Sequence, residues 1–316
     1  MVHILGFAAV AALVSTVSAQ CGSGTPDATV THGYTGDYLT AIQRAVDSIS
    51  SGQRVSVLAS GSIGASTITI QAGKTFEGCG TINAAVRSGR RAIEVTNAAN
   101  VKIPYLTMSG NVYFGLRFSG TSGLTLSDIT FDLTTGMGIR FDRDLAANTN
   151  VKMGTINCKR TSSHCVETWN INQLEIGSII ARNVGEFGLL LQAVTNAKVG
   201  LVDGDNVAAG NGYRYATVRF ANRAARLNNA YNTNICVPKV KSRGGGRGIF
   251  CVSESGGAEI GSIDLADNGN NAIANSSLTL LPLRKGKVEK TLSVLESLYG
   301  SSDEAVEMLM AIQDTL

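Results

Sequence analysis

The sequence predicts an all-β fold, a right-handed parallel β-helix in which short strands wind into stacked coils. From residue 55 onward, short β-branched segments alternate with turns of Gly, Asn, Ser and Asp. Between residues 100 and 274, similar phrases recur at a period of roughly 23 to 26 residues. No helical pattern separates these segments, which argues against βαβ units.

Residues 1–19 are expected to be a secretory signal. An apolar run from Ile4 to Val17 precedes Val17-Ser18-Ala19, a small-residue cleavage pattern. The run is short for a membrane span, which takes about 20 residues. The chain is therefore expected to be secreted and extracellular, with residues 20–283 forming one β-helix domain.

All six cysteines follow the expected cleavage point, and disulfides are typical of an oxidising compartment. Six cysteines allow 15 pairings. Proximity favours two short pairs and leaves a third to hold the amino end: Cys158–Cys165, Cys236–Cys251 and Cys21–Cys79. No CxxC pair or His/Cys cluster predicts zinc, so no metal site is assigned.

Charge is sparse in this chain. Charged residues make up 16% of it and the net charge is +3, an excess too small to indicate nucleic-acid binding. No stretch after the signal is long and apolar enough to cross a membrane. We expect a monomer that contacts neither nucleic acid nor membrane.

The first ordered element expected after the polar lead-in is a helix over 37–51. Leu39, Ile42, Val46 and Ile49 recur at helical spacing. A face this apolar is expected to cap the end of the β-helix.

Strands of four to six residues are then expected in VSVLAS, STITIQ, TFEGCGTIN and AIEVTN. The repeated coils begin near Asn100, Gly123, Thr149, Gln173, Asn196, Thr233 and Gly257. Each opens with a phrase such as NVKIPYLTMSG or QLEIGSIIARN and then enters a second short strand such as GLRF, GIRFD, CVETW or TVRF. Leucine-rich repeats would need LxxLxLxxN phrases and a helical back, and a sandwich would not repeat this order of phrases. Stacked coils with about three strands each fit better.

Residues 284–316 change in composition and suggest two helices. This helical tail is expected either to cap the open end of the β-helix or to be a divergent C-terminus.

Alternation in the second strand of each coil predicts which side chains point outward. Stacked strands lie about 4.8 Å apart, so these side chains should form columns. The first column is Arg117, Arg140, Glu167, Leu190, Arg219 and Phe250. The second is Ser119, Asp142, Trp169, Gln192 and Ala221, and a margin of turn residues holds Tyr113, His164, Tyr213, Arg214, Tyr215 and Arg247.

The columns bring cationic, acidic and aromatic groups together on one outer sheet. An exposed Trp169 and the tyrosines could stack on sugar rings, and arginine binds carboxylates through two hydrogen bonds. The alternative is an ordinary solvated sheet, where Arg and Glu pair for little energy. The predicted substrate-binding residues are Trp169, Gln192, Arg117, Arg247, Arg223 and Tyr213.

The coil phrases from Asn100 to Ala274, the signal and the segment SRGGGRGIFCVSESGG resemble the pectin-lyase-like family of secreted right-handed β-helix proteins, particularly its fungal members. The resemblance covers most of the mature chain and implies an enzyme acting on acidic plant cell-wall polysaccharide. The polygalacturonase set of NTD, paired aspartates, GHG and RIK is missing. The acidic calcium cluster of many pectate lyases is not evident either, and Ca²⁺ stays open as a cofactor.

A pectate lyase-like β-elimination is the expected reaction on such a substrate. It needs a cation on the uronate carboxylate and a base beside the proton that is removed. Arg219 and Arg140 are the candidates for carboxylate binding and base, with Lys159 or His164 as the alternative base or acid and Tyr215 as proton donor.

Two other functions stay open. Asp142 and Glu167, on neighbouring coils, could serve a glycoside hydrolase acting on pectic polysaccharide. A non-catalytic, effector-like protein that binds cell walls would keep Trp169 and the tyrosines but would need no base.

Overall fold

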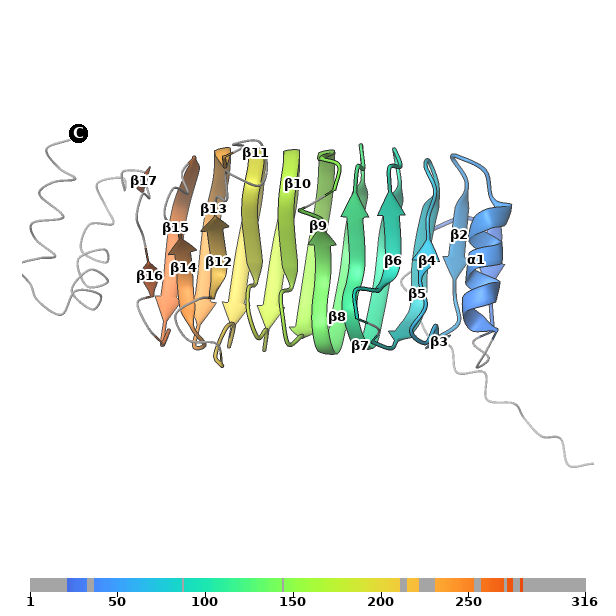
Figure 1. The fold of residues 1–316 in the computed structure, drawn as a ribbon, viewed down its shortest axis with the longest axis horizontal. Helices are drawn as coiled ribbons and strands as arrows, with labels where there is room; N and C mark the ends of the chain where they lie inside the picture. The colour runs from blue at the N-terminus through green and yellow to red at the C-terminus, as the bar shows by residue number, and fades with distance from the viewer. Residues whose placement is uncertain are drawn as a thin grey trace, which may run out of the picture.

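The computed structural model is an all-β parallel β-solenoid of about 10 turns. Figure 1 shows the coils stacked side by side along the long axis of the molecule. The structure describes residues 22–32, 37–86, 88–143, 145–210, 215–221, 231–252, 257–269, 272–274 and 279–280. The expected signal, the tail 284–316, Cys21, Tyr213, Arg214 and Arg223 lie outside these residues.

The strands of the described residues form one continuous sheet with parallel pairing throughout. In chain order they are β1 (Ala28–Val30), β2 (Arg54–Val57), β3 (Gly61–Ser62), β4 (Ile68–Thr69), β5 (Thr75–Ala84), β6 (Arg91–Thr96), β7 (Lys102–Ser119), β8 (Thr125–Phe141), β9 (Asn148–Arg160), β10 (Val166–Arg182), β11 (Leu189–Asp205), β12 (Ala216–Ala221), β13 (Thr233–Arg243), β14 (Arg247–Cys251), β15 (Ala258–Ala266), β16 (Ile273–Ala274) and β17 (Thr279–Leu280).

The register confirms the repeat read from the sequence. Corresponding positions of successive coils pair in one unbroken row: Lys102, Thr125, Lys152, Glu175, Lys198, Cys236 and Glu259. The long coil predicted from Asn196 keeps this row, because β11 pairs directly with β13. Its extra residues lie between these strands and contain β12, which pairs with β11 and β14.

Several strands are longer than predicted. β7, β8, β10 and β11 each continue for 17 or 18 residues, where three separate short strands were expected. These strands bend around the corners of the coil instead of ending there. Asn170 in β10 and Asn196 in β11 have positive φ values of 53° and 56° at such bends. Asparagine tolerates this left-handed conformation better than most residues.

Inward side chains form one core that runs the length of the solenoid. Leu116, Ile139, Val166, Leu189 and Val218 pair from coil to coil in one row, and all five are fully buried. Burial of each such side chain stabilises the fold by about 1.5–3 kcal/mol. Since every inward residue contacts the coils before and after it, the core fixes the register of the outer face as well.

The helix predicted over 37–51 is present as α1 (Tyr38–Ser48). Ile42 and Val46 are fully buried and belong to the same core as the strands. Figure 1 shows α1 beside β2, at the N-terminal end of the stack of coils. The capping role assigned to this helix stays a prediction. No helix in the described ranges is long and apolar enough to span a membrane.

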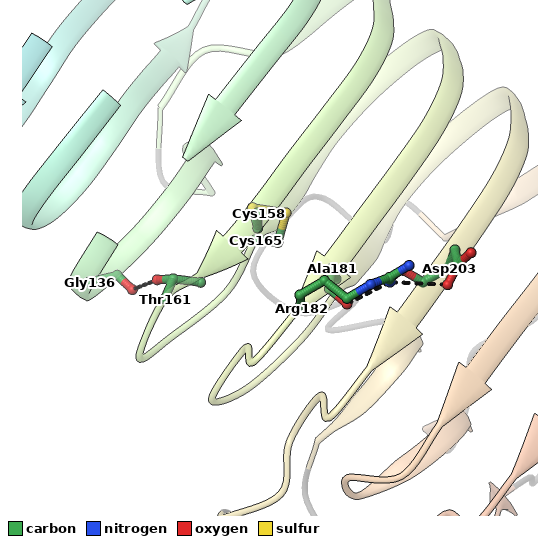
Figure 2. Close-up of a disulfide and its surroundings, with 7 residues drawn as sticks. All are labelled: Gly136, Cys158, Thr161, Cys165, Ala181, Arg182 and Asp203. Atoms are coloured by element: carbon green, nitrogen blue, oxygen red, sulfur yellow. Dashed lines mark hydrogen bonds and ion pairs between the residues drawn. A yellow bond between two sulfur atoms is a disulfide. The ribbon is translucent and has the colours of Figure 1, made fainter. Parts of the chain in front are cut away.

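The predicted disulfide Cys158–Cys165 is confirmed, with a Cα–Cα distance of 5.8 Å. Figure 2 shows it joining the end of β9 to the residue before β10. In the same turn, the Thr161 hydroxyl donates to the carbonyl of Gly136 on a preceding coil. On the next turn, Arg182 Nη1 donates to the Asp203 carbonyl of the following coil. The turn that carries His164 is therefore fixed at both ends.

The predicted pair Cys236–Cys251 is wrong, because both cysteines are free. Cys236 lies on the outer side of β13, whereas Cys251 points into the core from β14. Burial raises the pKa of the Cys251 thiol to about 12. Cys79 is disulfide-bonded, and its expected partner, Cys21, lies outside the described residues.

Candidate functional site

The first column predicted from alternation is confirmed by the register. Strand pairing places Arg117 beside Arg140, Arg140 beside Glu167, and so on through Leu190, Arg219 and Phe250. The second column holds Trp169, Gln192 and Ala221 in register. We call the outer sheet surface that carries both columns the column face.

Ion pairs cross the coils on this face. Arg117 donates to Asp142 through Nε at 2.7 Å and through Nη2 at 2.5 Å, and Arg140 pairs with Glu167. Arg140 Nε also lies 3.8 Å from Asp142, and Arg117 lies 3.8 Å from Glu94. Both Asp142 and Glu167 are buried. Removing one partner of a buried pair leaves a charge without compensation, so these residues hold the face together.

Glu167 connects the two columns to the turn margin. Its Oε1 accepts a hydrogen bond of 2.7 Å from the Trp169 indole, and its Oε2 accepts from Arg140. The same Oε2 lies 4.0 Å from His164 Nε2. Glu167 therefore positions three side chains and is not an open carboxylate.

The expectation of an exposed Trp169 is wrong, since only 4% of the residue is exposed. Trp169 packs with Phe187, Leu190 and Ala221 in a small apolar cluster outside the solenoid core. The Arg143 guanidinium lies 5.7 Å from its ring centre. Alternation predicted that Trp169 points away from the core, but the apolar neighbours that cover it come from other coils.

His164 contacts a carboxylate that sequence reasoning did not single out. Its Nδ1 lies 2.9 Å from Glu186 Oε2, and the residue is 8% exposed. The distance is that of an ion pair, although the N–H bond is poorly aligned with the oxygen. Glu186 also accepts a hydrogen bond of 2.6 Å from Ser163 and interacts with the Tyr215 hydroxyl. Glu186 occupies the turn position that Ser163 occupies on the preceding coil, so comparing the turn positions beside His164 between coils could have identified it.

These contacts change the pKa of Glu186. Burial raises the pKa of Glu186. The contact with His164 and the hydrogen bonds of Ser163 and Tyr215 together lower it by more than burial raises it, so the net pKa is below its ordinary value. A carboxyl with a lowered folded-state pKa binds fewer protons in the folded than in the unfolded state, so stability rises with pH. This contribution is present above the ordinary pKa of 4.5 and is lost as the pH falls through the folded value.

We expect Glu186→Gln to flatten the pH dependence of stability. Between about pH 5 and pH 3, the free energy of unfolding should fall less steeply than in the wild type. Urea unfolding at several pH values measures this difference. Glu175→Gln, at a carboxylate whose side chain is 63% exposed, is the control and should leave the slope nearly unchanged. Equal slopes for Glu186→Gln and the wild type would contradict the assignment.

Aromatic rings support two further arginines of the face. The His164 ring stacks on Phe187 with centroids 4.5 Å apart, and the Arg219 guanidinium lies 4.9 Å from the same Phe187 ring. Arg219 also lies 5.0 Å from Phe250, and Arg247 lies 4.5 Å from it. These contacts hold both guanidiniums on the part of the face that follows His164.

Gln192 is buried, with 3% exposed, and its Nε2 has no hydrogen-bond partner. Lys159 is not brought to the column face, because it is exposed on β9 at a register shift between Cys158 and Arg160. The predicted residues Tyr213 and Arg223 lie outside the described residues. Within the described ranges, no three His, Cys, Asp or Glu side chains are grouped to hold a metal ion.

No family model and no curated protein matches the chain. Among solved structures, it is similar to the A-module of the mannuronan C-5 epimerase AlgE4 of Azotobacter vinelandii. The match covers 82% of this chain and 100% of the module, with 10% sequence identity and a TM-score of 0.33. A likeness of this degree carries no argument about activity.

Proposed function

We propose that the chain is a secreted enzyme that acts on uronate-containing polysaccharide by removing the proton alpha to the carboxylate. One observation carries the proposal: His164, Glu186 and Tyr215 form a cluster for proton transfer, and Phe187 joins it to Arg219. Arg219 and Arg247 supply the cations expected to neutralise a uronate carboxylate. Lyase chemistry by β-elimination is the reaction we favour.

In this scheme, Arg219 binds the carboxylate and stabilises the charge that develops on it. His164 Nε2 takes the proton from C5, and Glu186 and Glu167, on the two sides of the ring, stabilise the imidazolium that forms. The C4–O4 bond breaks, its electron pair leaves with O4, and a C4=C5 double bond forms. Tyr215 donates its proton to the departing oxygen; the His164 imidazolium then releases the C5 proton to water and Tyr215 takes one from water, so both groups return to their starting states.

The contacts of Asp142 and Glu167 favour hydrolysis less than elimination. A glycosidase needs one carboxyl group to donate a proton and a second to act as base or nucleophile. Asp142 and Glu167 are buried, and their oxygens accept hydrogen bonds from Arg117, Arg140 and Trp169. Arg140, one of the two arginines predicted to bind the carboxylate or act as base, is paired with Glu167 in the same network. His164 is therefore the better candidate for the base.

Incubation of the purified chain with polygalacturonate, polymannuronate and neutral glucans tests the reaction class. Elimination gives new absorbance near 235 nm from the unsaturated product. Reducing ends without that absorbance would support hydrolysis, and inversion at C5 without cleavage would show that the proton is removed and returned. Binding without any reaction would support a non-catalytic protein that binds cell walls. Repeating the assay with a chelator tests a need for Ca²⁺.

The proposed secretion is tested separately. The full chain expressed in a eukaryotic host should appear in the medium with Gln20 as its first residue. Retention inside the cell with the N-terminus intact would contradict it.

A further inference from the structure

One residue from each coil, at the point where the chain enters the column face, forms a row that we call the turn row. In coil order it is Arg90, Tyr113, Gly136, Ser163, Glu186 and Tyr215. The order follows from the pairing of Arg91 with Phe114 and of Phe114 with Met137. Backbone bonds from Ser163 to Gly136 and from Glu186 to Ser163 continue it. The proton-transfer cluster occupies one end of this row, and Arg90 and Tyr113 occupy the other.

Tyr113 is an exposed aromatic residue at that far end. It is 43% exposed, and its ring meets the edge of Phe114 with centroids 4.5 Å apart. Phe114 is itself held beneath the guanidiniums of Arg117 and Arg140. The Tyr113 ring is thus supported from one side and open to solvent, as a stacking surface for an amphipathic ring must be.

Arg90 is the cation available beside Tyr113. It is exposed and makes no ion pair with any described residue, whereas Arg91, Arg117 and Arg140 are each paired. A hollow of about 220 Å³ lies beside Arg90 and is also lined by Ala65, Ser66 and Thr67. An unpaired guanidinium next to a hollow can bind a carboxylate without breaking an existing contact.

The turn-row position between Tyr113 and Ser163 carries no side chain. Gly136 has φ +78°, and a Cβ there would lie 1.9 Å from the Val112 carbonyl oxygen. No side chain can therefore stand at this position. Tyr113 and Ser163 are two coils apart, or about 10 Å at the usual strand spacing, so an extended chain can pass between them.

We infer that Tyr113 and Arg90 form a distal subsite for an acidic polysaccharide that lies along the solenoid axis. A sugar ring stacks on Tyr113 and a uronate carboxylate binds Arg90, several residues along the polymer from the ring held at Arg219. The inference rests on the proposed function for the identity of the ligand, an acidic polysaccharide, but it does not depend on the proposed reaction. It implies that long oligomers bind more tightly than short ones.

Calorimetric titration tests the subsite with galacturonate oligomers of two and six sugars as probes. The full chain carries His164→Gln in every sample, so that no probe is consumed. Tyr113→Ala and Arg90→Gln should each weaken hexamer binding about tenfold and leave dimer binding unchanged. Added salt should weaken hexamer binding less in the Arg90→Gln variant than in the chain that carries only His164→Gln. Tyr231→Ala is the matched control, because Tyr231 is also 43% exposed but lies outside the turn row, next to Asn232, which donates to the carbonyls of Leu191 and Ala221.

Unchanged hexamer binding in both variants would overturn the subsite, even if the enzyme cleaves polygalacturonate. Weakened hexamer binding together with no reaction in the absorbance assay would support the subsite and refute the proposed reaction. If neither galacturonate nor mannuronate hexamers bind the parent chain, the subsite and the substrate class both fail.

Discussion

Replacing His164 with glutamine should lower kcat/KM on the acidic polysaccharide about 10²- to 10⁴-fold, the usual range for loss of a general base. Glutamine keeps the length and polarity of the side chain but cannot accept the C5 proton. Formation of the unsaturated product at 235 nm, followed from pH 4 to pH 9, measures the change. The residual rate should also lose the pH dependence that the imidazole gives the wild type.

Two variants act as controls for this result. His32→Gln changes a histidine far along the chain from the column face and should leave the rate unchanged. Glu186→Gln leaves the imidazole in place but removes the carboxylate 2.9 Å from its Nδ1, so it should lower kcat and shift the pH profile without abolishing activity. A His164→Gln variant that folds normally and retains full activity would show that another group is the base.

Replacing Arg219 with alanine should lower kcat/KM about 10²- to 10³-fold, the range measured when one group that stabilises developing charge is removed. Arg219 lies over the Phe187 and Phe250 rings, and the same Phe187 ring contacts the His164 ring. Arg219 binds the substrate carboxylate in the ground state, and this carboxylate carries more charge as the proton leaves. Loss of Arg219 should therefore raise KM and lower kcat. Steady-state rates with oligomers of defined length separate the two effects.

Arg219→Lys should recover part of the lost rate, because lysine restores the charge but not the two parallel hydrogen bonds. Arg160→Ala is the control. Arg160 is an exposed arginine, paired with Asp132, on a different part of the coil, so its loss should change little. Full activity in Arg219→Ala would remove Arg219 from the site and leave Arg247 as the candidate cation.

The column face shows which features of a repeating fold can be predicted from the local sequence pattern. Alternation and a repeated phrase were enough to place Arg117, Arg140 and Glu167 in one column, because a parallel coil stacks each position on its equivalent. The same reasoning failed for Trp169, whose burial depends on Phe187 and Leu190 of the next coil. It also passed over Glu186, which precedes its strand without any motif of its own.

The cysteines show the same limit. Cys158 and Cys165 flank one turn, so separation along the chain predicted their pairing. Cys236 and Cys251 are also close in sequence, but one points outward from β13 and the other into the core from β14. The direction of a side chain from a coil, and not its distance along the chain, decides whether two thiols can meet.

The sequence by itself determined the solenoid, the period of its coils and the residues that share each outer column, since these follow from alternation and from stacking of equal repeats. Only the tertiary structure decided which of those outward groups are buried, which are paired with each other, and which remain available to a ligand. The physical reason is that contacts across coils depend on side-chain reach and on neighbouring turns. For that reason Glu167 is a buried partner of Arg140, whereas Arg90 and Tyr113 are open to solvent.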